Sequence, residues 1–242
     1  MTTTDLTGGR RDAAVFPPYL YSAYRSSLRR APHLDPISCQ PTLSELTGPG
    51  PALGAVEPAD ADLTTNAGTG AEAMGERLIV TGRVLDADER PVPNTLIEIW
   101  QANAAGRYIH RLDQHHAPLD PNFLGIGRCL TDEHGAYRFV TIRPGAYPWR
   151  NHPNAWRPAH IHFSLFGPSV RSRLVTQMYF PGDPLHDLDP IMGSVPMPEA
   201  RARLVARYHH EVTEPEQALG YRFDFVVRGP AATPFEPPRQ AP

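Results

Sequence analysis

Short runs in which apolar and polar residues alternate dominate the chain from residue 76 onward. The runs of this kind are ERLIVTGRVLD, NTLIEIWQAN, GRCLTD, AYRFVTIRPG, AHIHFSLFG, RLVTQMYFPGD and YRFDFVVRG. Each is rich in β-branched and aromatic residues, which favours a strand. In the second run Ile97, Ile99 and Gln101 share one face, because successive side chains of a strand point to opposite sides. About seven short strands, joined by turns such as DEHG, predict a mainly β protein with a β-sandwich architecture.

Only two stretches favour a helix, and both are short. One lies around residues 20–29 and would end before Pro32. The other covers residues 198–211, PEARARLVARYHHE, which opens with a proline and a glutamate suited to a first helical turn. His209 and His210 would then end this helix, where cationic side chains suit the helix dipole. We therefore expect one or two short helices beside the strands.

The first 75 residues differ from the rest of the chain. They contain polar and glycine-rich stretches such as TGPGPALG and NAGTGAEAMG, which cannot bury much surface on their own. This segment is either a disordered leader or an arm that packs on a partner. Aromatic residues favour the arm, since disordered leaders are poor in them; these are Phe16, Tyr19, Tyr21 and Tyr24. We expect an N-terminal arm over residues 1–75 that forms a subunit contact, followed by a β-sandwich domain over residues 76–242.

Composition and charge exclude several classes of function. The formal net charge of −3 leaves no basic surface for nucleic acid or for an anionic membrane. All 23 cationic residues are arginines, so a Schiff-base lysine and a P-loop lysine are excluded. The chain shows neither the apolar stretch of a signal peptide nor a run long enough to span a membrane. In such a chain Cys39 and Cys129 are expected to be free, buried thiols, and the expected location is the cytoplasm.

Three histidines occur within the segment YPWRNHPNAWRPAHIHF, residues 147–163. His160 and His162 are separated by one residue in a strand pattern, so both imidazoles point to one face and can chelate a metal. The same spacing is also compatible with two ordinary half-buried histidines. Zinc is the usual guess for histidine ligands, but it prefers cysteine, histidine or carboxylate neighbours. The neighbours in this segment are tyrosine, tryptophan and arginine.

A tyrosine oxygen in the same segment would suit ferric iron. Tyrosinate is a hard, strongly donating ligand, and a trivalent ion keeps it deprotonated at neutral pH. Tyr147 precedes Pro148, which forces an extended or turn conformation on it. Tyr147 could also be a buried aromatic residue whose hydroxyl bonds to the backbone. The pattern does not say which of the nine tyrosines completes a metal site.

The segment GRYIHRLDQHHAPLDPNFLGIGRCLTDEHGAYRFVTIRPGAYPWRNHPNAWRPAHIHF resembles the ferric intradiol ring-cleaving dioxygenases. The resemblance extends from about Tyr19 to Phe235 and is densest over residues 76–185. It implies one Fe(III) per chain, bound by two tyrosines and two histidines. Matching the motifs GRY, PGAYPW and RPAHIHF places these ligands at Tyr108, Tyr147, His160 and His162.

More narrowly, the chain resembles the iron-bearing β chains of the two-chain members that act on protocatechuate. Such a β chain assembles with an α chain of similar fold, which lacks a complete iron site, into a hetero-oligomer of αβ units. The resemblance therefore implies intradiol cleavage of protocatechuate by O2 to 3-carboxy-cis,cis-muconate, in the β-ketoadipate route of aromatic catabolism. Residues 1–75 are too rich in proline and glycine for the helical dimerisation segment of members that cleave catechol.

The resemblance also implies roles for residues around the iron. Tyr147 and a hydroxide leave the metal when substrate binds and accept the two phenolic protons, while Tyr108 stays bound. Arg157 would stabilise negative charge on the ring, although a surface salt bridge is the alternative for it. Gln177 matches a catalytic glutamine of the family that lies just outside the iron ligands. The substrate-binding residues implied in this way are Tyr24, Trp149, Ile191 and Arg157. Both Trp149 and Ile191 could instead be ordinary core residues.

Two alternatives to protocatechuate cleavage stay open. The same class of enzyme could act on catechol, hydroxyquinol or a substituted catechol. A non-catalytic β-sandwich binding module, in which the histidines only pack, is the alternative from another class. The remaining histidines match no ligand position: His152 fits a loop, His115 and His116 fit a loop near the site entrance, and His110 is unassigned.

Overall fold

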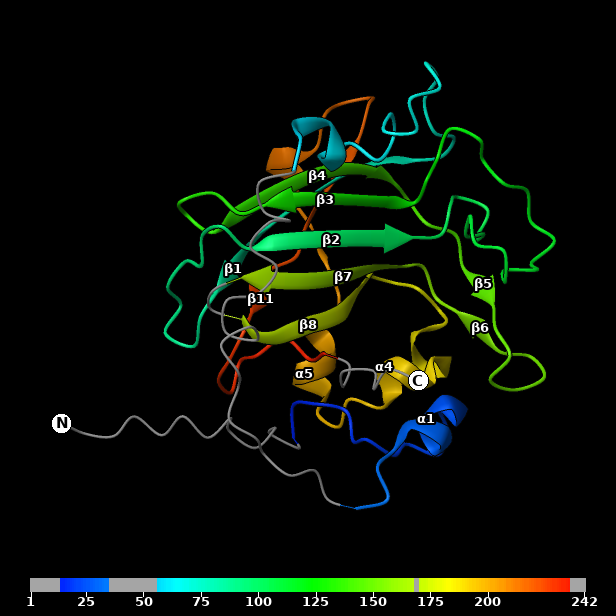
Figure 1. Cartoon of the computed structure of the whole chain (residues 1–242), viewed down its shortest axis with the longest axis vertical. Coiled ribbons are helices and arrows are strands. Elements are labelled where there is room, and N and C mark those ends of the chain that lie inside the picture. The colour runs from blue at the N-terminus through cyan, green and yellow to red at the C-terminus, as the bar shows by residue number, and fades with distance from the viewer. Residues whose placement is uncertain (1–13, 35–55, 168–169, 236–242) are drawn as a thin grey trace.

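The computed structural model describes residues 14–34, 56–167 and 170–235, which form two β-sheets packed on each other. The first sheet contains β1 (Arg77–Leu85), parallel β10 (Leu219–Arg222) and β11 (Phe225–Val226), antiparallel β4 (Ala136–Ile142), and β9 (Arg207–Tyr208) beside β10. The second sheet is antiparallel, in the order β3 (Ile126–Leu130), β2 (Leu96–Gln101), β7 (His160–Gly167) and β8 (Val170–Tyr179). Figure 1 shows the strands of the second sheet side by side.

The main core lies between the two sheets and follows from the alternation within each strand. Ile97 and Ile99 of β2 and Ile161 and Phe163 of β7 are at most 1% exposed, and the ring of Phe163 contacts that of Phe139 on β4. Because side chains alternate along a strand, the two histidines of β7 point to the other face of the second sheet. This arrangement confirms the predicted mainly β, sandwich-type fold.

Short elements lie beyond one end and beyond the β8 edge of the second sheet (Figure 1). The strands β5 (Tyr147–Pro148) and β6 (Trp156–Arg157) form a small ribbon that lies beyond one end of this sheet in Figure 1. Below β8 in the same view lie α1 (Arg25–Arg30), α4 (Pro190–Gly193) and α5 (Pro198–Ala202). A second apolar cluster joins Val15 and Phe16 of the arm to Tyr179 of β8 and to Met192 of α4. The single turns of 3-10 helix are η1 (Pro58–Ala61), η2 (His186–Leu188) and η3 (His210–Val212).

The predicted helix over residues 198–211 is wrong beyond Ala202. The chain after α5 is extended and joins the edge of β8: the Tyr179 N–H donates to the Leu204 carbonyl, and the Ala206 N–H donates to the Tyr179 carbonyl, both at 2.8 Å. It then crosses to the first sheet as β9. Pairing of the backbone with two sheets therefore outweighs the local helix preference, and neither His209 nor His210 ends a helix as predicted.

The predicted strands otherwise agree with the structure, except that the last run forms two strands. Between β10 and β11 the Phe223 N–H donates to the Thr81 carbonyl, and the Arg83 N–H donates to the Asp224 carboxylate, both at 2.9 Å. These two bonds lie where the pairing of β1 passes from β10 to β11. The first helix begins at Arg25 rather than near residue 20.

Other predictions concern the arm, the cysteines and membranes. Leu63, from the segment predicted as the arm, is fully buried in the main core, and its N–H donates to the Val140 carbonyl at 2.9 Å. Cys129 is buried and free as predicted, whereas Cys39 lies outside the described residues. Within the described ranges, every helix is too short or too polar to cross a bilayer.

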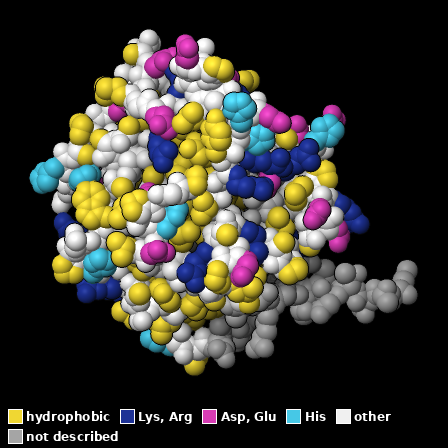
Figure 2. Space-filling model, turned by 180° about the vertical axis from the view of Figure 1, so that it is seen from behind, with side chains coloured by type: hydrophobic (Ala, Val, Ile, Leu, Met, Phe, Trp, Pro, Cys, Tyr) yellow, Lys and Arg dark blue, Asp and Glu magenta, His cyan; other side chains and the backbone are white. Residues whose placement is uncertain are grey.

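Charged side chains of both signs are neighbours on the surface. On the first sheet Arg138 pairs with Glu214 at 3.4 Å, and Arg222 pairs with Asp224 at 3.0 Å. Figure 2, which views the molecule from behind, shows arginine and acidic side chains next to one another on that face. Exposed pairs of this kind contribute only about 0–1 kcal/mol each to stability.

Candidate metal centre

The two histidines of β7 converge on one point outside the sandwich core. Their Nε2 atoms are 3.1 Å apart. The Nδ1 atom of His160 lies 2.7 Å from the Pro158 carbonyl, which can only accept, so Nδ1 carries the proton and Nε2 keeps its lone pair. Burial holds the pKa of His160 well below its usual value, and the nearby Arg157 charge lowers it further. A neutral imidazole with a fixed tautomer is the form that binds a metal.

Two tyrosines complete the cluster. The Tyr147 hydroxyl lies 3.3 Å from Nε2 of His160, and the rings of Tyr108 and Tyr147 meet edge to face with centroids 5.3 Å apart. The buried Tyr108 hydroxyl has no hydrogen-bond partner within the described ranges. Leaving such a group unpaired costs about 1–3 kcal/mol, so the position calls for an explanation. A cation bound between the four side chains would provide one.

The donor set fits a hard, highly charged cation. Burial raises the pKa of both Tyr108 and Tyr147, and the phenol of Tyr147 raises the pKa of Tyr108 further. Both tyrosines therefore stay protonated unless a strong positive charge stabilises the phenolates. In the described part of the chain, no group of three or more histidine, cysteine or carboxylate residues could hold a metal. A metal at this point would depend on tyrosine oxygens, which favours ferric iron over zinc.

Neighbouring strands place further residues beside the histidines. In the register of the second sheet, His160 lies opposite Tyr179 of β8, and His162 lies between Gln177 of β8 and Trp100 of β2. Directly opposed residues share a face, so all five side chains project to the same side. The ring of Trp100 stacks on that of His162 with centroids 4.8 Å apart and planes 3° apart. This stack fixes the orientation of one imidazole.

Arg157 is part of a buried network rather than of a surface salt bridge. Only 3% of it is exposed, and it donates to the side chains of Gln177, Tyr179 and Asp189. Burial alone would lower the pKa of Arg157, but the neighbouring Tyr179 and Asp189 outweigh this effect and raise it, so the guanidinium stays charged. The structure therefore brings together Arg157 and Gln177, which the sequence named separately as catalytic residues.

A cavity of about 880 Å³ opens beside the cluster. Tyr108, Tyr147 and Trp149 contribute to its wall, and Trp149 also lies under the Arg157 guanidinium, 5.4 Å from its Cζ. The remaining lining residues include Trp100, His110, His115 and His116. The prediction of a loop carrying His115 and His116 near the entrance agrees with this position.

The other predicted substrate contacts, Tyr24 and Ile191, are not among the residues that line this cavity. Tyr24 of the arm contacts Trp149 with ring centroids 5.6 Å apart. Asn151 fastens it there, because its side chain accepts from the Arg25 N–H and donates to the Ala23 carbonyl, both at 2.8 Å. Ile191 instead lines a separate small cavity with Gln177 and Tyr179. His152 is exposed in the turn between β5 and β6, as predicted.

Sequence reasoning missed several residues that shape this centre. They are Trp100, Asn151, Tyr179 and Asp189, together with Asn103, whose carbonyl accepts from the N–H groups of Gly106 and Gly145. Only Asp189 had a local signal, because an aspartate before a proline is a typical start of a helix, and Asp189 does cap α4. The others act through contacts between segments far apart in the sequence.

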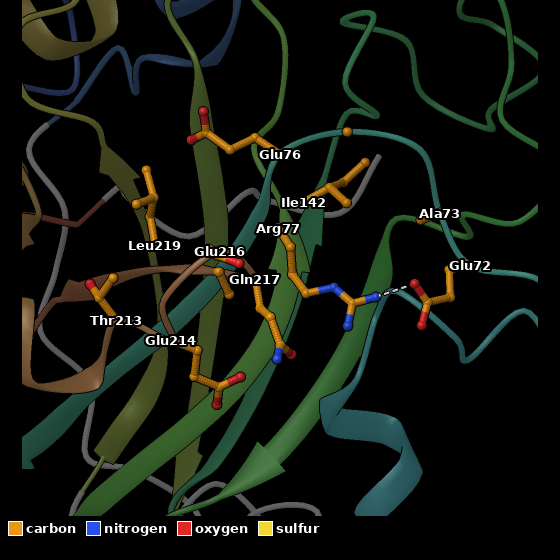
Figure 3. Close-up of a pocket in the computed structure, with 12 residues that line it drawn as sticks. Glu72, Ala73, Glu76, Arg77, Ile142, Thr213, Glu214, Glu216, Gln217 and Leu219 are labelled. Atoms are coloured by element: carbon orange, nitrogen blue, oxygen red, sulfur yellow. Dashed lines mark hydrogen bonds and ion pairs between the residues drawn. The ribbon is translucent and has the colours of Figure 1, made fainter.

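A second cleft, of about 630 Å³, lies between residues 72–77 and 213–219. Figure 3 shows Arg77 reaching the carboxylate of Glu72 within it. Two of its other glutamates are also paired, Glu76 with Arg143 and Glu214 with Arg138. No predicted site residue is among the twelve lining residues drawn in Figure 3, so the cavity beside the cluster is the candidate site.

Comparisons with known proteins agree with this centre. The family model described as "Dioxygenase" matches residues 48–229, and the one described as "Protocatechuate 3,4-dioxygenase beta subunit N terminal" matches residues 10–42. The protocatechuate 3,4-dioxygenase beta chain of Burkholderia cepacia is 58% identical over 226 residues, which cover 93% of this chain and 96% of that protein. The hydroxyquinol 1,2-dioxygenase of a Rhizobium strain is 33% identical over 155 residues, 58% of this chain and 50% of that one.

Solved structures of similar fold belong to the same group. The 3-chlorocatechol 1,2-dioxygenase of Rhodococcus opacus 1CP is 27% identical with a TM-score of 0.50, covering 64% of this chain and 60% of that one. The catechol 1,2-dioxygenase of Acinetobacter sp. ADP1 is 26% identical with a TM-score of 0.52, covering 74% and 60%. With a family match over most of its length and a 58% identical relative, this chain belongs to the iron-dependent intradiol dioxygenases.

Proposed function

We propose that this chain is the catalytic β chain of an enzyme that opens the ring of protocatechuate with O2 and forms 3-carboxy-cis,cis-muconate. The observation that carries the proposal is a cluster beside a cavity of about 880 Å³: the Tyr147 hydroxyl lies near two facing histidine nitrogens, and the Tyr108 ring packs edge to face on that of Tyr147. The nearly full-length similarity to a protocatechuate-cleaving β chain supports this substrate over catechol or hydroxyquinol.

In this proposal one Fe(III) per chain is held by Tyr108, Tyr147, His160 and His162. The two phenolates offset most of the charge of the ion, and the fixed tautomer of His160 keeps a lone pair directed at it. When bound, the ferric ion holds the doubly deprotonated catechol and prepares its ring for reaction with O2. Coordination to the ion would give a partner to the Tyr108 oxygen, which has none among the described residues.

Tyr147 is proposed to take up a proton from the substrate. It lies on a two-residue strand at the cavity wall and is half-buried. Burial raises the pKa of Tyr147, which favours the protonated phenol once the phenolate is no longer stabilised by the metal. Tyr147 can therefore act as a base during substrate binding, while Tyr108 remains in place.

Arg157 is proposed to stabilise the negative charge that develops on the ring. Its guanidinium is almost fully buried and held by three side chains, so its charge is screened little by water. Trp149 and Tyr24 would form a wall against the flat ring of the substrate, and Ile191 would close the site behind Gln177. These roles complete the proposed substrate-binding set.

The proposed partner is the α chain of the same enzyme, in a hetero-oligomer of αβ units. Relatives of this chain include α chains, such as that of Pseudomonas putida with 28% identity over 166 residues. Residues 1–75 are proposed to form part of the contact between subunits, and residues 76–242 the catalytic domain. The cytoplasm is the proposed location, in line with the free thiol of Cys129.

Co-expression with the α chain, followed by oxygen uptake on a panel of catechols, tests this proposal. We expect fast uptake on protocatechuate, little on catechol or hydroxyquinol, and a burgundy-red complex that contains iron. Tyr108→Phe should lower the iron content and weaken the colour, while Tyr208→Phe, a change to a half-exposed tyrosine on β9, should leave both intact. A colourless, folded complex that binds zinc and consumes no oxygen would refute it.

A further inference from the structure

Arg157 is held by Asp189 and Tyr179, two residues outside the proposed catalytic and substrate-binding set. The Asp189 carboxylate is 1% exposed and Tyr179 is fully buried. One carboxylate oxygen, Oδ2, accepts from Nε of Arg157 at 3.2 Å and from Nη2 at 3.0 Å. The Tyr179 hydroxyl accepts from the same Nη2 at 3.1 Å. Two of the three guanidinium nitrogens are therefore fixed on one side.

Asp189 is itself held in one orientation. Its second oxygen, Oδ1, accepts from the Ile191 N–H at 3.0 Å and so caps the first turn of α4. With Oδ1 bound to the backbone, Oδ2 can only face Arg157. The position of α4 therefore determines, through this carboxylate, where the Arg157 guanidinium lies.

Tyr179 links this network to the strand that bears the histidines. It lies opposite His160 in the β7–β8 register, so its hydroxyl has a fixed distance from the candidate metal centre. That hydroxyl lies 3.0 Å from Oδ2 of Asp189 and 2.9 Å from Oε1 of Gln177, and its single proton can go to either. The remaining guanidinium nitrogen, Nη1, makes none of these bonds.

We propose that Asp189 and Tyr179 are positioning residues for Arg157, which fix its guanidinium so that its charge faces the reacting ring. The proposal rests on the proposed function, since it concerns the contribution of Arg157 to ring cleavage. Neither residue needs to contact the substrate. An arginine is flexible, and a charge stabilises a transition state best when it is already in place.

The cap and the ion pair of Asp189 can be separated by one substitution. Asparagine caps helices about as well as aspartate, so Asp189→Asn keeps the bond from the Ile191 N–H. Its amide group would then face Nε and Nη2 with a donor instead of an acceptor, and the guanidinium would turn away. Tyr179→Phe removes only the hydroxyl and keeps both charges and the packing of the ring.

Two changes elsewhere serve as matched controls. Asp120 is also a buried carboxylate, but within the described ranges its bonds come from the backbone N–H groups of Met74 and Asn122. Tyr137 is a buried tyrosine whose hydroxyl donates to the Phe223 carbonyl in the first sheet. Asp120→Asn and Tyr137→Phe therefore report the cost of losing a buried polar group away from Arg157.

The experiment compares these four variants in the co-expressed αβ complex. Iron content, the absorption of the resting complex, the thermal midpoint, and kcat and KM for protocatechuate are measured for each. Removing one charge-stabilising donor costs about 10²–10³-fold in kcat; because Asp189→Asn displaces Arg157 without removing it, we expect a smaller loss of roughly ten- to hundredfold, and a smaller one still for Tyr179→Phe. Iron content, absorption and KM should change little in both. The controls should lower only the thermal midpoint.

Crystal structures of the wild-type and Asp189→Asn complexes separate this proposal from the proposed function. A displaced Arg157 guanidinium supports the positioning role whatever the wild-type complex turns over. An unchanged guanidinium, or a kcat of Asp189→Asn equal to that of the wild type, overturns it. A wild-type complex that takes up no oxygen would refute the proposed function but not the geometric claim.

Discussion

The four proposed iron ligands come from two kinds of backbone. His160 and His162 lie on β7, between β2 and β8, where hydrogen bonds to both neighbours fix their position. Tyr108 lies in the loop between β2 and β3, and Tyr147 lies on the two-residue strand β5. Ligands on a sheet inherit their geometry from the strand register, whereas ligands on loops need contacts of their own.

Backbone hydrogen bonds and close backbone contacts hold together the segments that carry Tyr108 and Tyr147. The Asn103 carbonyl accepts from the N–H groups of Gly106 and Gly145, each at 2.9 Å. A Cβ on Gly106 would lie 2.1 Å from the Ala146 carbonyl oxygen, and one on Gly145 would lie 2.5 Å from the Ala104 carbonyl oxygen. Only glycine permits this close approach, which sets the spacing of the two phenols. The comparison thus contrasts a rigid histidine side with a tyrosine side that depends on two glycines.

The largest effect is expected on the histidine side. His162→Ala removes one nitrogen ligand but leaves the strand intact, so we expect a folded complex that loses most of its iron and more than about 99% of its oxygen uptake. Iron per chain and oxygen uptake are the measurements. His152→Ala, a change to an exposed histidine of the same segment, should leave both unchanged. Full iron in His162→Ala would contradict the assignment.

On the tyrosine side, Gly106→Ala should push the two loops apart. Gly106 has φ +78°, so alanine costs about 1–2 kcal/mol from backbone strain alone. Gly70 has φ +79° with open space around it, so Gly70→Ala carries the strain without the clash. We expect Gly106→Ala to lose much of its iron and its tyrosinate absorption, and Gly70→Ala to lose only stability. Equal spectra for the two variants would show that the glycine contact does not set the phenol spacing.

The arm is expected to affect substrate binding rather than the metal. Asn151→Ala removes two hydrogen bonds, worth about 1 kcal/mol each, and frees Tyr24 from Trp149. KM for protocatechuate should rise several-fold at unchanged iron content, and trypsin should cleave faster after Arg25. Asn66→Ala, which loses one bond to the Ile126 carbonyl, is the control. A fall in kcat with unchanged KM would place the arm outside the binding site.

The smallest effect is expected for the stack on His162. Trp100→Leu removes a parallel ring contact worth about 0.5–1.5 kcal/mol. A chelator should extract iron a few times faster, while kcat changes little. Trp156→Leu, at a 40% exposed tryptophan, provides the comparison. Equal extraction rates would show that the strand register alone orients the histidine.

The sequence predicts the histidine side of the centre better than the tyrosine side. Strand runs and the shared face of His160 and His162 follow from alternation, which is a local rule. The prediction of a helix beyond Ala202 is wrong because pairing of the backbone with β8 and β10 overrides the local preference for a helix. The network of Asp189 and Tyr179 joins segments that only the folded sheet brings together, so no local pattern reveals it.

The tyrosines illustrate a limit of another kind. Spacing and composition could not choose Tyr108 among nine tyrosines, because its position depends on the approach of two loops. Only similarity to a known family singled it out. The family motif therefore carries information about a three-dimensional contact that no local pattern in this sequence reveals.

The visible absorption of the purified αβ complex tests the central claim most directly. If Tyr108 and Tyr147 both bind Fe(III) as phenolates, the resting complex should be burgundy-red. Tyr108→Phe and Tyr147→Phe should each weaken this absorption, and anaerobic protocatechuate should change it in the wild type. A complex with full iron whose absorption is unaffected by either substitution would contradict the two-tyrosine, two-histidine centre.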